Sequence, residues 1–148
     1  MNDILELFTA LSAGLFTGAA IYISFVEHPA RMECGTELAV TEFRPSYKRA
    51  AVMQASLAAS GFLSAMTAWL TGSSILWLIG GVLLGAIIPY TMIVIFTINK
   101  RLLDPSLDKN SELALLLLKR WGRLHALRSL LGLMSFLIFL YSLLKDGK

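Results

Sequence analysis

Four long apolar runs constrain the fold of this chain more than any other feature of its sequence. Each run holds 21 to 24 residues. A helix of about 20 apolar residues crosses the roughly 30 Å hydrocarbon core of a bilayer. The pattern therefore predicts four transmembrane helices, at Ile4–Val26, Ala50–Thr71, Ile75–Ile98 and Leu124–Leu144.

The composition agrees with a membrane protein. Of the 148 residues, 56% are hydrophobic and only 16% are charged, and the mean hydropathy is +0.68. A soluble domain of this length needs more polar surface. The four spans and their connections use the whole chain, so residues 1–148 are expected to form a single all-α domain, a four-helix transmembrane bundle. The lipid bilayer is its expected partner.

The first connection, Ala30–Arg49, is polar but holds an apolar patch that ends at Phe43. This patch predicts a short interfacial helix. Pro29 disfavours helix at the residue before it, so span 1 is expected to end near His28. Pro45 suits the first turn of span 2.

The other two connections differ in length. Gly72-Ser-Ser74 is tight, which makes spans 2 and 3 antiparallel neighbours. Pro89 removes a backbone hydrogen bond and predicts a kink near Gly85. In the third connection, Asn110 or Ser111 can cap a helical extension that leads into span 4 and is expected to bend at Gly122.

The basic residues predict an orientation. Of the 13 Lys and Arg residues, only Lys145 and Lys148 lie outside Arg31–Arg128, and the short second connection has none. By the positive-inside rule, both long connections face the cytoplasm and both termini lie on the non-cytoplasmic side of an inner or plasma membrane. No basic patch is interleaved with aromatic residues, so nucleic acid is not an expected partner.

Polar and aromatic residues gather where the spans meet the predicted cytoplasmic face. Trp121, His125 and Arg128 are spaced four and three apart, which places them on one face of a helix. Gln54 lies deeper in span 2 and is expected to hydrogen-bond across the bundle. Spans 1 and 3 end, and spans 2 and 4 begin, at that face, so the topology brings together Glu27, His28, Glu42, Tyr47, Asn99, Trp121, His125 and Arg128.

The order of these motifs resembles a family of small membrane proteins named after the fungal anthrone oxygenases. The resemblance covers nearly the whole chain and implies a four-span bundle. For the named branch of the family it implies oxidation of a polycyclic aromatic anthrone to a quinone. The matching motifs are Ala13–Gly18 leading to Glu27-His-Pro29, then Phe43–Tyr47, Pro89-x-Thr91 followed by Asn99, and Trp121-x-x-x-His125-x-x-Arg128.

An anthrone-type substrate suggests a mechanism that needs no cofactor. Such a ring has acidic hydrogens, and its enolate can give an electron to dioxygen. His125 or His28 is the candidate base, and Arg128 is the cation that would stabilise the enolate. The substrate itself, an anthrone or another hydrophobic small molecule, is expected to contact Trp121, Tyr47, Asn99 and Glu27.

A metal or haem site is a second interpretation of the same residues. His28 and His125 can be ligands, with Glu27 nearby and Asn99 on a facing helix. These ligands would come from different helices, and the sequence has no His-x-x-x-His spacing to support them.

A third interpretation is a binding or assembly protein without chemistry. Gly14-x-x-x-Gly18 and Gly81-x-x-x-Gly85 are faces on which helices can approach closely, as in a homo-oligomer. In this case Arg128 is expected to form a salt bridge to Glu27 or Glu42 that joins span 4 to span 1.

Overall fold

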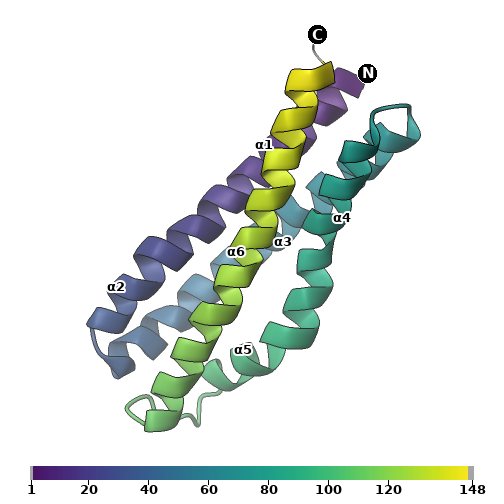
Figure 1. Ribbon diagram of the computed structural model, residues 1–148. Helices are drawn as coiled ribbons and strands as arrows, with labels where there is room; N and C mark the ends of the chain where they lie inside the picture. The colour runs from purple at the N-terminus through teal and green to yellow at the C-terminus, as the bar shows by residue number, and fades with distance from the viewer. Residues whose placement is uncertain (1, 147–148) are drawn as a thin grey trace.

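The computed structural model describes residues 2–146 as an elongated bundle of helices (Figure 1). Two short segments, η1 and η2, are π-helical, and the rest of the helical structure is α-helical. The elements in chain order are α1 (Asn2–Tyr22), η1 (Ile23–Glu27), α2 (His28–Glu33), α3 (Thr36–Leu70), α4 (Ile75–Tyr90), η2 (Thr91–Ile95), α5 (Phe96–Leu102) and α6 (Glu112–Asp146).

The elements join into four continuous helical rods, α1–η1–α2, α3, α4–η2–α5 and α6. Within the described chain, these four rods are long and apolar enough to cross a membrane, which confirms the predicted all-α four-span bundle. α1 and α4 each pack against both α3 and α6, so the rods form a ring in the order α1, α3, α4, α6. The start of α1, the α3–α4 turn and the end of α6 lie together (Figure 1). We call this the terminal end, and the opposite end, with the α2–α3 turn and the α5–α6 connection, the loop end.

The helix of span 1 is longer than the sequence predicted. The first rod continues through Pro29 and ends at Glu33, so the predicted end near His28 is wrong. Pro29 stands in the first turn of α2, where a missing backbone N–H is tolerated. The wide π turn η1 lies directly before it. Gly35 then reverses the chain with a φ of 89°, a conformation that glycine adopts without strain.

The predicted interfacial helix is not a separate element. It forms the first part of α3, which runs unbroken from Thr36 to Leu70 and contains Pro45. Span 2 therefore does not begin at Pro45. The patch around Phe43 is buried within the bundle, and this packing stabilises the helix on both sides of the proline.

At the loop end, the helices continue beyond the length that is needed to cross a membrane. α3 and α6 each have 35 residues, which at 1.5 Å per residue is about 52 Å. A hydrocarbon core of about 30 Å leaves roughly two to four turns of each helix outside it. These turns pack with α2 and α5 around their own apolar core, which includes Ala39, Val40, Phe43, Leu102, Ala114, Leu117, Leu118 and Trp121.

The third rod departs from α-helix geometry nearly two turns later than predicted. The sequence predicted a kink near Gly85, but the π turn η2 follows Pro89 and begins at Thr91. Figure 1 shows α5 turned toward the base of α6 relative to α4. Gly85 serves packing instead, because a Cβ there would lie 2.7 Å from the Phe62 ring on α3.

α6 is one helix from Glu112 to Asp146. The Ala114 N–H donates to the Ser111 hydroxyl at 3.1 Å, which confirms Ser111 as the cap of the helical extension. Gly122 does not interrupt the helix. A Cβ at this position would lie 2.5 Å from Nε2 of His28, so Gly122 is the point at which His28 packs against α6.

Candidate functional site

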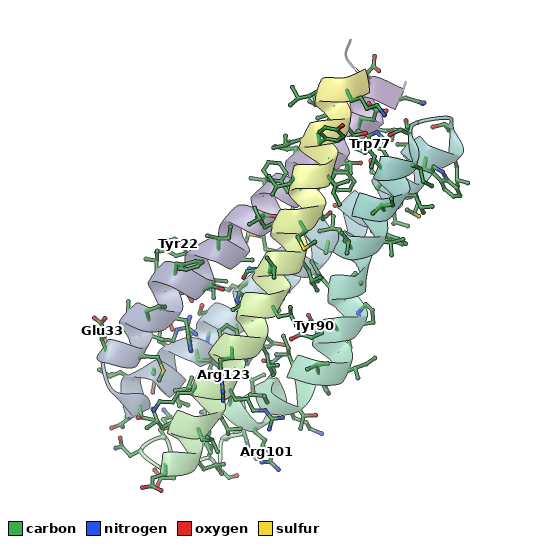
Figure 2. The ribbon with its side chains drawn as sticks, viewed as in Figure 1. Tyr22, Glu33, Trp77, Tyr90, Arg101 and Arg123 are labelled. Atoms are coloured by element: carbon green, nitrogen blue, oxygen red, sulfur yellow. The ribbon has the colours of Figure 1, made fainter. Side chains whose placement is uncertain are left out.

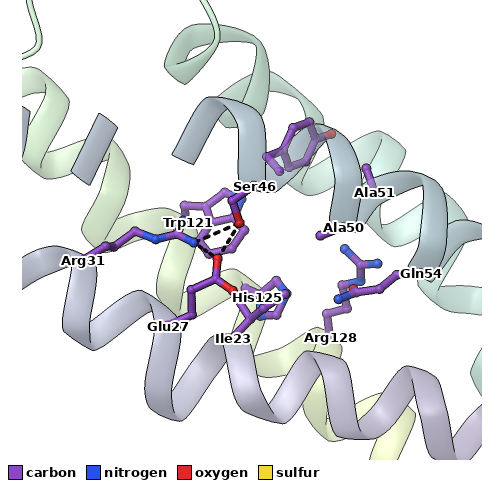
Figure 3. A pocket seen from close by; sticks show the side chains of 11 residues that line it. Ile23, Glu27, Arg31, Ser46, Ala50, Ala51, Gln54, Trp121, His125 and Arg128 are labelled. Atoms are coloured by element: carbon purple, nitrogen blue, oxygen red, sulfur yellow. Dashed lines mark hydrogen bonds and ion pairs between the residues drawn. The ribbon is translucent and has the colours of Figure 1, made fainter. Parts of the chain in front are cut away.

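A small cavity lies in the loop half of the bundle, between η1, α2, α3 and α6 (Figure 3). We call it the inner cavity. Its volume is about 20 Å³, which is room for about one water-sized molecule. Five of the seven residues predicted for the site line it: Glu27, Tyr47, Trp121, His125 and Arg128.

His125 is held in place by two serines. It is 2% exposed, and its Nδ1 lies 3.0 Å from the Ser24 hydroxyl and 3.5 Å from the Ser129 hydroxyl. Its ring stacks on Trp121 with centroids 4.7 Å apart. In the described chain Nε2 has no hydrogen-bond partner, so it is the ring nitrogen available to a molecule in the inner cavity.

Asn99 fixes the two aromatic residues of the site. Its side chain accepts a hydrogen bond from the Trp121 indole N–H at 2.8 Å and donates to the Tyr47 hydroxyl at 3.0 Å. Asn99 is fully buried and does not line the inner cavity. It therefore holds Trp121 and Tyr47 in position but does not itself face a ligand in the inner cavity.

Glu27 and Glu42 are both paired with Arg31. The guanidinium of Arg31 donates to Glu27 and lies 2.6 Å, through Nε, from a Glu42 oxygen. The Ser46 hydroxyl also donates to Glu27 (dashed lines in Figure 3). The predicted salt bridge from Arg128 to Glu27 or Glu42 is therefore wrong.

Arg128 is a buried cation without a counter-ion. It is 8% exposed, its Nε has no hydrogen-bond partner, and no carboxylate of residues 2–146 lies within ion-pair distance. Its guanidinium lies 5.3 Å from the centre of the Phe16 ring, a cation–π contact that offsets part of the burial cost. An unpaired charge inside a membrane span is expensive and is usually functional.

Gln54 lies beside Arg128 (Figure 3). It is 1% exposed, and its Nε2 has no hydrogen-bond partner, so the predicted hydrogen bond across the bundle does not form. Two donors, Nε2 of Gln54 and Nε of Arg128, thus stand unpaired on residues that line the inner cavity.

His28 lies apart from this cavity. Its ring packs on Trp121 with centroids 5.2 Å apart, and it lines an open groove beside Gly122. The two histidines therefore contact the same indole, but only His125 faces the inner cavity. Across residues 2–146, no three His, Cys, Asp or Glu side chains gather in a metal-binding arrangement.

A second cavity adjoins the first one, between α3 and the α4–η2 segment. We call it the side cavity, and its volume is about 130 Å³. Tyr47, Ala51, Gln54 and Arg128 line both cavities, so these residues form a shared wall. The rest of its lining is Ala55, Ala58, Ile87, Ile88, Thr91 and Met92.

Three residues that hold the predicted site residues in place were not themselves predicted. Ser24 and Ser129 bind His125, and Arg31 pairs with the two glutamates. Two of them carry a sequence signal, because Arg31 follows Glu27 by four residues and Ser129 follows His125 by four, which is one helical turn. Ser24 reaches His125 from another helix, and only the tertiary structure reveals that contact.

The fold and the site together define an integral membrane four-helix bundle with a buried histidine and a buried, unpaired arginine in its loop half. A family model described as anthrone oxygenase matches residues 43–138, which is more than half of the chain. The chain therefore belongs to the anthrone oxygenase family, as the order of its motifs indicated. No curated protein and no solved structure matches the chain. The matched segment contains Tyr47, Asn99, Trp121, His125 and Arg128, whereas Glu27 and His28 precede it.

Proposed function

We propose that the protein is a membrane oxygenase that oxidises a hydrophobic aromatic small molecule of the anthrone type with dioxygen. One observation carries this proposal. His125, whose Nε2 is free, and Arg128, whose guanidinium is unpaired, line the same buried cavity. A base beside a cation in an apolar surrounding is what formation of an enolate requires.

The serine contacts favour the tautomer of His125 that can act as a base. The Ser129 hydroxyl donates to the Ala20 carbonyl at 3.0 Å, so it can accept from Ser24, whose oxygen is 2.9 Å away. Ser24 can then accept from Nδ1–H of His125 at 3.0 Å. This direction places one hydrogen in each of the three contacts and leaves the lone pair on Nε2.

The reaction balances with dioxygen as the only co-reactant. His125 takes a proton from the acidic ring CH₂ group through the one water molecule that the inner cavity can hold, and Arg128 stabilises the resulting enolate oxygen. The enolate passes an electron to dioxygen and the two recombine at the ring carbon. One oxygen atom becomes the new carbonyl and the other leaves as water with the two hydrogens of the CH₂ group, so four electrons pass from carbon to O₂. The residues of the site need no metal or organic cofactor for these steps.

Oxygen uptake with anthrone, measured on the protein in lipid nanodiscs, tests the proposal. We expect uptake by the wild-type protein and a loss of 10²-fold or more in His125→Gln, because general base catalysis contributes about 10² to 10⁴. His28→Gln separates the two candidate bases, since His28 lies outside the inner cavity. Loss in His28→Gln with activity retained in His125→Gln would assign the base to His28. Wild-type protein without uptake would contradict the proposal.

The assembly interpretation has less structural support than the sequence suggested. Three of the four glycines on the predicted faces pack within the chain, since a Cβ at Gly14, Gly81 or Gly85 would lie 2.9 Å or less from a neighbouring side chain. Only Gly18 has open space around it. A homo-oligomer through these faces would have to form around Gly18 alone.

We also propose that the loop end faces the cytoplasm. Exposed basic side chains concentrate there, including Arg101 and Arg123 (Figure 2), and positive charge favours the cytoplasmic side. Accessibility labelling of tags at Met1 and within Asp104–Asn110 tests the orientation. We expect the two sites to label from opposite sides, with the loop site cytoplasmic. Labelling from the same side would contradict the span count.

A further inference from the structure

The side cavity opens on the surface that faces lipid. Its outer lining includes Ala55, Ile88 and Met92, all of which are exposed side chains within the apolar runs of spans 2 and 3. Several neighbouring exposed side chains on the same two rods are also apolar, namely Val52, Met53, Ile93 and Val94. The opening therefore lies at the depth of the hydrocarbon core and not in water.

The inner end of the side cavity is polar. Gln54 and Arg128 stand there with unpaired donors. Tyr47 stands there as well. Its hydroxyl accepts a hydrogen bond from Asn99, which leaves its own hydrogen for another acceptor. Three donors and no carboxylate line the wall that the two cavities share.

Buried donors without acceptors are costly, and the cost is removed when an oxygen atom binds to them. The apolar lining of the side cavity gives the rest of the ligand a hydrophobic surrounding. Its volume of about 130 Å³ is close to the ~150 Å³ cavity that holds one benzene ring. A polycyclic ligand seated there must leave part of its ring system between α3 and α4, in contact with lipid.

We propose that a flat hydrophobic ligand enters sideways from the bilayer between α3 and the α4–η2 segment, and that Tyr47, Gln54 and Arg128 bind its carbonyl or enolate oxygen. The inner cavity, with room for about one small molecule, then holds dioxygen or water beside His125. The inference rests on the proposed function for the nature of the ligand. It adds the entry route and a residue, Gln54, that was not among the expected site residues.

Two probes that cannot undergo the oxidation proposed for an anthrone are used to test the binding step alone. Anthraquinone and anthracene have the same ring system and differ by two carbonyl oxygens. Binding is measured by quenching of tryptophan fluorescence in nanodiscs, with protein-free nanodiscs as the blank. We expect the wild-type protein to bind anthraquinone about 10-fold more tightly than anthracene, since one good hydrogen bond to a charged donor is worth about that factor.

Two variants separate the anchor from the entry route. Gln54→Leu removes a donor at nearly constant volume and should reduce the preference for anthraquinone at least threefold. Ala55→Leu fills the mouth of the side cavity and should weaken both probes about 10-fold. Ser56→Leu is the matched control, because Ser56 is exposed on the same helix and lines neither cavity. It should bind both probes as the wild-type protein does.

The outcomes distinguish this inference from the proposed function. Equal affinity of the wild-type protein for both probes would overturn the oxygen anchor and favour an acyl chain as the occupant. Unchanged binding in Ala55→Leu would overturn lateral entry. The expected binding pattern without oxygen uptake from anthrone would support the inference while contradicting the oxygenase. Oxygen uptake by the wild-type protein without this binding pattern would support the oxygenase and contradict the inference.

Discussion

The two halves of the bundle differ in whether their buried polar groups have hydrogen-bond partners. In the terminal half, the hydroxyl groups of Thr9, Ser64 and Ser73 and the carboxylate of Glu6 are paired. The Thr9 hydroxyl donates to Ser64 at 2.8 Å, Ser64 donates to the Leu5 carbonyl at 3.0 Å, and Ser73 donates to Glu6 at 2.6 Å. The loop half keeps a charged donor on Arg128 and an amide donor on Gln54 without partners.

Packing follows the same division. In the terminal half, Trp77 stacks on Phe139 at 5.1 Å, and a Cβ at Gly80 would touch the Phe139 ring. Two donors outside the loop half, Trp77 Nε1 and the Thr17 hydroxyl in α1, also lack a partner, but both are neutral groups. The loop half instead holds the two adjoining cavities. Polar groups that stabilise a bundle have their hydrogen-bond partners within it. Donors that stay unpaired beside a cavity are therefore better explained by binding of a ligand than by a contribution to stability.

Replacing the buried cation should produce the largest effect and separates function from stability most clearly. Arg128→Met should lower kcat/KM for anthrone oxidation by about 10² to 10³, the usual loss when a donor to a developing oxyanion is removed. The melting temperature in detergent should stay the same or rise, because an uncompensated buried charge has been replaced by an apolar chain of similar length. A variant that unfolds would show instead that Arg128 is structural, and the contrast between the halves would fail.

The next largest effect concerns close packing in the terminal half. Gly80→Leu should destabilise the fold by about 1 to 3 kcal/mol or more, because a Cβ there lies 2.5 Å from the Phe139 ring and overpacking forces helices apart. Gly18→Leu is the matched control, since nothing lies within 4 Å of its Cβ. Thermal unfolding of the two variants should therefore differ clearly. Similar melting temperatures would mean that the Gly80 contact is easily relieved.

The smallest effect compares a paired polar group with an unpaired one. Thr9→Val removes a hydrogen bond at constant shape and should destabilise the bundle by about 0.6 kcal/mol, the average for such bonds inside membranes. Gln54→Leu removes an unpaired group and should cost nothing or stabilise. Unfolding in denaturing detergent measures both. A larger loss in Gln54→Leu than in Thr9→Val would reverse the comparison.

The sequence predicted the four spans because apolar runs of membrane length have few alternative structures. It also predicted the Ser111 cap and the grouping of Trp121, His125 and Arg128, which all line the inner cavity. That grouping rested on α-helical spacing, and α6 is α-helical throughout the segment. The spacing argument therefore holds wherever the helix geometry is regular.

The spacing argument does not extend to His28 because of the π turn η1. A π turn adds about one residue to an α-helix, which rotates the following residues by roughly 100°. A regular α-helix would put Ser24 and His28, four residues apart, on one face, but η1 spans Ile23–Glu27 and lies across this interval. Ser24 contacts His125, whereas His28 turns toward Trp121 and Gly122. The pairing of Glu42 with Arg31 was likewise out of reach, because it joins α3 to α2.

The opening of the side cavity at Ala55, Ile88 and Met92 has a kinetic consequence. A ligand that arrives through it is drawn from the lipid phase, so the concentration that saturates the protein is a mole fraction in the bilayer and not a molarity in water. Adding empty vesicles at a fixed total amount of ligand and protein would slow turnover by surface dilution, while adding buffer would barely change it. A product released the same way returns to the membrane, where any later reaction must find it.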